Sequence, residues 1–93
     1  VGRAVQPPVE LLERFVARAE ELLSTDPELF NDHAVALEDN GEHARARTNY
    51  EKALAIDPDN VLAHTGMARV LAQLGDAAGA DRHAAEAKRL KPE

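Results

Sequence analysis

The 93-residue chain has no cysteine, no tryptophan and only three other aromatic residues, two Phe and one Tyr. Without cysteine, neither a disulfide framework nor a thiolate metal site can form. With so few aromatic rings, a domain of this size must build a thin core from alanine and aliphatic side chains. Alanine has the highest helix propensity and lets helices approach closely, so the composition predicts an all-α fold.

Basic residues and long apolar runs are also scarce. Asp and Glu outnumber Lys and Arg by 17 to 11, giving a net charge of -6, which argues against nucleic acid as the main partner because phosphates require clustered cations. No apolar run approaches the roughly 18 residues of a membrane span, and the first residues show no signal-peptide core. We therefore expect no membrane insertion and a cytoplasmic location. The chain begins at Val1 rather than at methionine, so we expect a fragment of a longer protein.

Prolines and the spacing of apolar residues divide the chain into an arm and five helices. Residues 1–8, VGRAVQPP, lack helical periodicity and predict an extended arm. Residues 9–24 carry apolar side chains at three- and four-residue spacing, which predicts an amphipathic helix. Four further helices are predicted from Pro27 to about Asn40, from about Glu42 to Ile56, from Val61 to Leu74, and from Asp76 to about Leu90.

Local signals support these boundaries. Thr25 or Asp26 can cap the first of the four helices, and Glu28 lies three residues after Thr25, as a capping box requires. Asn60 and Asp76 can cap later helices in the same way. The predicted helix ends coincide with glycine or with Asp-Pro: Gly41, Gly75 and Asp57-Pro58.

An internal repeat appears when the chain is aligned with itself at an offset of 34 residues. The residues that agree are small, turn-forming or apolar, and they are the ones that shape a helical hairpin. The matching pairs include Ala34 and Ala68, Leu37 and Leu71, Gly41 and Gly75, Ala46 and Ala80, Ala53 and Ala87, and Pro58 and Pro92.

These residues resemble the tetratricopeptide repeat, a helix-turn-helix unit of 34 residues. Residues 27–60 form the first repeat and residues 61–93 the second; residues 9–24 are expected to cap the first repeat. Departures from the pattern are His33, His64 and Ala84, where leucine or a large ring is usual. The resemblance implies antiparallel helix-turn-helix units stacked as a short right-handed superhelix, an α-solenoid of about five helices.

The resemblance also implies a non-catalytic module that binds a partner peptide or helix in a concave groove lined by the first helix of each repeat. Because the first repeat is acidic there, a basic or amphipathic partner segment is the preferred hypothesis over plain solvated surface. The positions carried over from the family to this groove are Glu28, Asn31, Asp32, Val35, Glu38, Asp39, Leu62, Thr65, Arg69 and Gln73.

The sequence lacks the patterns of metal sites and active sites. The histidines His33, His43, His64 and His83 lack the i, i+4 spacing of a helical zinc site, and no nucleophile-base pair or phosphate-binding loop is present. We therefore expect no metal, no cofactor and no enzymatic activity. The alternatives are a structural element that forms homo-oligomers through its terminal helices, and a regulatory segment of a larger enzyme.

Overall fold

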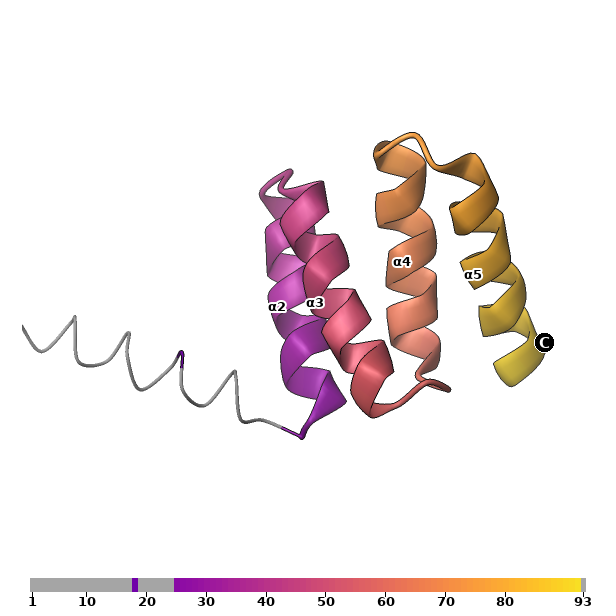
Figure 1. Cartoon of the computed structure of the whole chain (residues 1–93), viewed down its shortest axis with the longest axis horizontal. Coiled ribbons are helices and arrows are strands. Elements are labelled where there is room, and N and C mark those ends of the chain that lie inside the picture. The colour runs from indigo at the N-terminus through magenta and orange to yellow at the C-terminus, as the bar shows by residue number, and fades with distance from the viewer. Residues whose placement is uncertain (1–17, 19–24, 93) are drawn as a thin grey trace, which may run out of the picture.

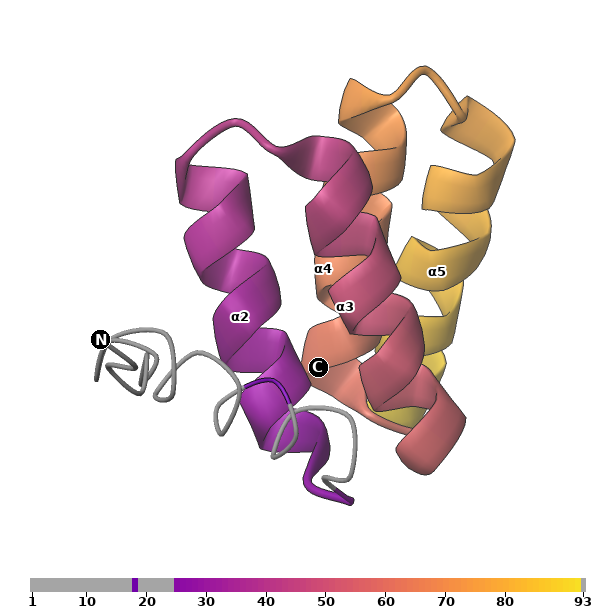
Figure 2. The same cartoon turned by 60° about the vertical axis from the view of Figure 1, so that its left-hand side comes forward.

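The computed structural model describes residue 18 and residues 25–92, and this part of the chain consists of two helical hairpins (Figure 1). The helices are α2 (Pro27–Asp39), α3 (His43–Ile56), α4 (Val61–Gln73) and α5 (Ala77–Leu90). Helices α2 and α3 form the first hairpin and α4 and α5 the second, while α3 packs against α4 and α2 also touches α4. Figure 2 shows the two hairpins stacked side by side, as repeats of a solenoid are.

The four helices begin and end within one or two residues of the predicted boundaries. The all-α fold of helix-turn-helix pairs is therefore confirmed. The predicted arm at 1–8 and helix at 9–24 lie outside the described residues, apart from Arg18, which is helical. Four of the five predicted helices thus belong to the part of the chain that the structure describes.

The start of α2 differs in one detail from the prediction. Asp26, not Thr25, occupies the N-cap position, and its Oδ1 accepts a hydrogen bond from the Glu28 backbone N–H at 3.0 Å. The capping box from Thr25 to Glu28 is therefore wrong, because the helix begins one residue later than that box requires.

The other predicted turn signals are confirmed. The side chains of Asn60 and Asp76 each accept a backbone N–H at 2.9 Å, at the starts of α4 and α5. Gly41 and Gly75 have φ values of 77° and 89°, in the left-handed region where a Cβ atom is strained. Each hairpin therefore turns at a glycine.

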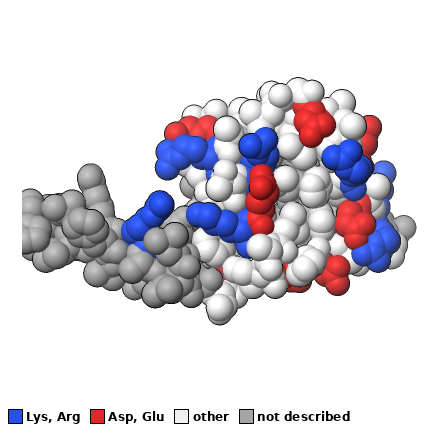
Figure 3. Space-filling view, viewed as in Figure 1, with Lys and Arg blue, Asp and Glu red and all other residues white. Residues whose placement is uncertain are grey.

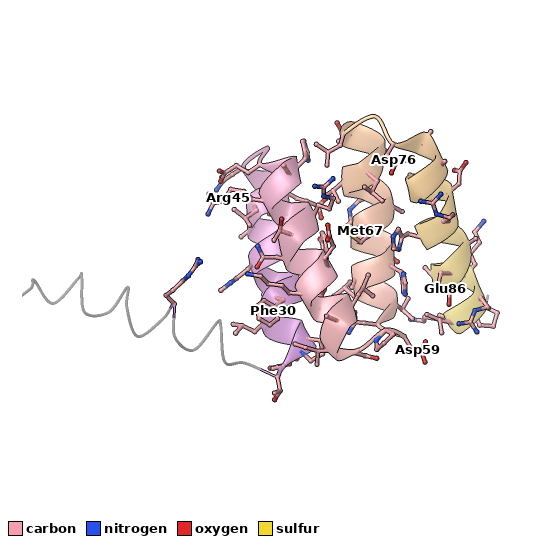
Figure 4. All side chains as sticks on the ribbon, in the orientation of Figure 1. Phe30, Arg45, Asp59, Met67, Asp76 and Glu86 are labelled. Atoms are coloured by element: carbon pink, nitrogen blue, oxygen red, sulfur yellow. The ribbon has the colours of Figure 1, made fainter. Side chains whose placement is uncertain are left out.

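Small residues at the crossing points let the helices pack closely. Ala34 in α2 and Ala46 in α3 have no exposed surface. Tyr50, also fully buried, fills the space between α3 and α4, where Gly66 leaves room for its ring: a Cβ atom at Gly66 would lie 2.2 Å from the ring. Met67, labelled in Figure 4, adds its side chain to the same core from α4.

Candidate binding surface

One side of α2 is exposed along its length. Glu28, Asp32, Val35 and Asp39 recur at spacings of three and four residues, so they form one stripe on the helix, and all four are exposed. Val35 leaves 37% of its surface exposed. Within the described residues, none of the three carboxylates forms an ion pair. This stripe is acidic with an apolar centre.

A second stripe runs along α4. Leu62, Thr65, Arg69 and Gln73 follow the same three- and four-residue spacing, and all are exposed. Leu62 is the most exposed large apolar residue of the described chain, at 52%. The Thr65 hydroxyl donates to the Val61 carbonyl in its own helix at 2.9 Å. This stripe therefore carries one apolar residue, two neutral polar residues and one cation, Arg69.

Two polar contacts bring the stripes onto one surface, called here the α2–α4 face. Near the start of both helices, the Asn31 side-chain amide donates to Asn60 Oδ1 at 3.0 Å. Further along, Arg69 of α4 binds Glu38 of α2 with two hydrogen bonds, Nε to Oε2 at 3.1 Å and a terminal nitrogen to Oε1 at 3.0 Å. Because α2 and α4 are linked at both places, the residues that flank these contacts share one face.

Tyr50 of α3 also bonds to the Glu38–Arg69 pair. The Tyr50 hydroxyl donates to Glu38 Oε1 and accepts from Arg69 at 3.3 Å. A bidentate arginine-carboxylate pair is geometrically specific and stronger than a neutral hydrogen bond. The cluster thus connects α2, α3 and α4 across the boundary between the hairpins.

Burial and these contacts set the charge state of the cluster. Burial alone would raise the pKa of Glu38, but the hydrogen bonds from Arg69 and Tyr50 outweigh it and hold this pKa below its ordinary value. Burial, together with the neighbouring Glu38, raises the pKa of Tyr50 to about 12. At neutral pH the cluster therefore contains a carboxylate, a neutral phenol and a guanidinium, so its charges cancel.

The structure assigns different roles to the ten positions predicted for the groove. Asn31 is only 2% exposed, and its amide donates to Asn60, the N-cap residue of α4. It is therefore buried beneath the α2–α4 face. Glu38 is largely covered, and Arg69 is occupied by it. The other seven positions are exposed: Glu28, Asp32, Val35, Asp39, Leu62, Thr65 and Gln73.

A hollow of about 660 Å³ lies away from most of these residues, between α4 and α5. Of the ten predicted positions only Thr65 lines it. Lys88 and Lys91 also line it, and neither lysine forms an ion pair within residues 25–92. The full lining is Val61, Thr65, Ala87, Lys88, Lys91 and Pro92.

The internal repeat explains the position of this hollow. Thirty-four residues earlier, Thr65 and Lys91 correspond to Asn31 and Asp57. In the first hairpin both of these residues bond Asn60, the N-cap of α4, at 3.0 and 3.4 Å. On the first hairpin, the corresponding surface contacts the start of α4. The hollow is therefore the equivalent surface on the second hairpin.

A second hollow, of about 450 Å³, is lined by residues of α2 and α3 in the first hairpin and by Arg18. Its lining is Arg18, His33, Ala36, Leu37, Arg45, Thr48, Asn49 and Lys52. His33, which stands where the family pattern has an apolar residue, is exposed in this lining.

Two histidines meet in the second hairpin, a contact that the sequence interpretation missed. His64 of α4 and His83 of α5 approach to 2.9 Å between their Nδ1 atoms. They are 19 residues apart, and no short-range spacing signals a contact across the hairpin. Among the described residues, no group of three or more His, Cys, Asp or Glu side chains is arranged to hold a metal ion.

The surface charges are mixed on the side shown in Figure 3, where Lys and Arg alternate with Asp and Glu. Several are local pairs along one helix, such as Arg45 with Glu42 at 2.9 Å and Arg47 with Glu51 at 3.2 Å. Exposed pairs of this kind contribute little to stability. No helix in the described part of the chain is both long and apolar enough to span a membrane.

Comparison with known families agrees with this architecture. The family described as TPR repeat, the tetratricopeptide repeat, matches residues 36–75, which run from the last turn of α2 through α3 and α4. The match supports a TPR assignment for this part of the chain. TPR repeats in general mediate protein–protein interaction and are non-catalytic modules. No curated protein and no solved structure matches this chain.

Proposed function

We propose that this protein binds a basic, amphipathic segment of a partner protein on its α2–α4 face. The observation that carries the proposal is the set of unpaired carboxylates Glu28, Asp32 and Asp39 beside the exposed apolar side chains of Val35 and Leu62. Complementary charge selects the partner and accelerates its association, while apolar contacts supply affinity. The face thus suits alternating cationic and apolar side chains.

The Glu38–Arg69 pair supports the same choice of partner. Among the residues of the two stripes, Arg69 carries the single positive charge, and Glu38 neutralises that charge. The charge that remains on the face is therefore negative, and an acidic peptide would find no uncompensated cation among these residues.

The test uses two labelled helix-forming peptides, one built from Leu and Lys and the other from Leu and Glu in the same order. Fluorescence anisotropy measures their affinity for the wild type, for Asp32→Lys with Asp39→Lys, and for a control with Asp59→Lys and Asp81→Lys. The control changes the net charge equally but leaves the α2–α4 face intact. We expect the face variant to weaken binding of the Lys peptide by about tenfold, because two surface charge contacts sum to roughly 1.4 kcal/mol.

Salt provides an independent criterion. Binding of the Lys peptide should weaken as ionic strength rises, since exposed charges are screened over about 10 Å at 0.1 M salt. Equal loss in both charge variants, or salt-insensitive binding of the Glu peptide, contradicts the proposal.

The hollow between α4 and α5 favours a second candidate function, head-to-tail self-association through the ends of the chain. Residues 27–60 carry eight acidic and three basic residues, whereas residues 61–93 carry four acidic and five basic residues. The two repeats therefore have net charges of -5 and +1, counted with histidine neutral. A helix of a second copy that begins with acidic residues would meet Lys88 and Lys91 at the hollow.

Light scattering over a hundredfold range of concentration tests this candidate. Self-association predicts a mass that rises with concentration and returns to the monomer value in Lys88→Glu with Lys91→Glu. A monomer mass at every concentration, with peptide binding intact, rejects self-association and leaves the α2–α4 proposal standing.

A further inference from the structure

The contact between His64 and His83 is buried inside the second hairpin. His64 is 8% exposed and His83 is half-buried, with ring centroids 5.2 Å apart. The two Nδ1 atoms are 2.9 Å apart, and His64 Nε2 lies 2.8 Å from the Pro58 carbonyl oxygen in the α3–α4 turn. One imidazole therefore uses both nitrogens, one toward a carbonyl and one toward another imidazole.

These contacts determine where the protons lie. A carbonyl oxygen only accepts, so His64 Nε2 must carry a hydrogen. A neutral imidazole has one N–H, so His64 Nδ1 is an acceptor and His83 Nδ1 must donate to it. The neutral pair thus has a single arrangement: His64 protonated on Nε2 and His83 on Nδ1.

Two added protons have unequal effects on this arrangement. The first can bind His83 Nε2, which leaves the Nδ1–H donor of His83 and the hydrogen bond intact. A second proton can bind only His64 Nδ1. It would oppose the Nδ1–H of His83 across 2.9 Å, replacing an attractive contact by two facing donors on two cationic rings.

We propose that the His64–His83 pair is a proton-sensitive contact that holds α5 against α4 near neutral pH and releases α5 when both rings are protonated. This inference concerns the internal stability of the second hairpin and is independent of the partner proposed above. It rests on the geometry of the two contacts that three ring nitrogens make.

The surrounding charges act on this contact from both neighbouring helices. Burial lowers the pKa of His83, as do the neighbouring His64 and the cation Arg82, whereas nearby carboxylates oppose the shift. The charged groups that act on the pair are Glu51 from α3, Asp76 at the N-cap of α5, and Arg82 and Glu86 from α5.

The lowered pKa of His83 gives the same direction of pH effect as the geometry. The unfolded chain takes up this proton near pH 6.5, whereas the folded chain resists it until the pH is lower. Acidification therefore favours the unfolded state. The contribution of His83 is present above about pH 6.5 and is lost progressively below it.

The decisive variant is His83→Asn, whose side-chain amide can place a donor near the original Nδ1 but does not titrate in this range. His33→Gln, which changes a histidine outside the second hairpin, is the matched control. Melting temperatures are measured at pH 7.5 and pH 5. Between pH 7.5 and pH 5, the melting temperatures of the wild type and the control should fall by at least about 5 °C more than that of His83→Asn. A difference of this size corresponds to about 1 kcal/mol in a small domain.

Two measurements on the wild type keep the inference testable if the variant folds poorly. Nitrogen NMR at pH 7.5 should show His64 as the Nε2–H tautomer and His83 as the Nδ1–H tautomer. Hydrogen exchange, expressed as protection factors, should show α5 losing protection at pH 5 before α2 and α3. Opposite tautomers, or equal loss of protection in both hairpins, would overturn the proposal.

Discussion

Gly66 lies beneath the Tyr50 ring, and adding one methyl group there tests the packing between the hairpins. In Gly66→Ala the new Cβ would lie 2.2, 2.4 and 2.6 Å from three atoms of the ring. Ordinary contacts begin near 3.4 Å, so the ring or α4 must move by about 1 Å. The ring has little freedom, because it is fully buried and its hydroxyl is bound by Glu38 and Arg69.

Two effects of opposite sign determine the magnitude. Alanine is favoured over glycine inside a helix by about 1 kcal/mol. Overpacking a filled core costs about 1–3 kcal/mol, and a rigid ring places this case in the upper half of that range, at about 2–3 kcal/mol. The net loss is therefore about 1–2 kcal/mol, which lowers the melting temperature of a small domain by roughly 5–15 °C.

A double-mutant cycle separates the two effects. Thermal unfolding is measured for the wild type, Gly66→Ala, Tyr50→Leu and the double variant. Without the ring, Gly66→Ala should become neutral or stabilising, giving a coupling energy of about 2 kcal/mol. If Gly66→Ala raises the melting temperature of the wild type, the close approach of Tyr50 to α4 is refuted.

Three further predictions concern the same core and cluster. Ala46→Leu should cost about 1–3 kcal/mol in thermal melts, because Ala46 is fully buried where α2 and α3 cross; unchanged stability would contradict that crossing. Tyr50→Phe should lose about 0.5–1.5 kcal/mol in denaturant titrations, since it removes a hydroxyl that bonds Glu38 and Arg69; no loss would mean that these bonds contribute nothing. The wild type should lose stability as pH falls below about 4.5, because the lowered pKa of Glu38 makes its contribution present above that value and lost as the carboxylate is protonated. Glu38→Gln should flatten this part of the profile in urea unfolding at each pH, and an unchanged slope would show that Glu38 is not its source.

The helix boundaries were predictable because their causes are local. Asn60, Asp76, Gly41 and Gly75 act within a few residues of their own position, so the sequence pattern located every hairpin turn. The sequence left Thr25 and Asp26 open as the cap of α2, because both are good capping side chains and local sequence does not decide between them; the structure has Asp26.

The contacts between helices were less predictable. The repeat pattern placed Glu38 and Arg69 near one surface, but their pairing joins residues 31 positions apart and depends on how the hairpins stack. The repeat pattern placed Asn31 in the groove, yet Asn31 is buried and its amide bonds Asn60 at the start of α4. The His64–His83 contact depends on the relative rotation of α4 and α5, which periodicity does not specify.

The measurement that tests the binding proposal most directly is a titration of the isotope-labelled protein with the unlabelled Leu and Lys peptide, followed by NMR chemical shifts. We predict that the largest changes fall on Glu28, Asp32, Val35, Asp39 and Leu62, while the outer surfaces of α3 and α5 change little. Changes concentrated on α3 and α5, or no change at peptide concentrations up to the millimolar range, would contradict the proposal.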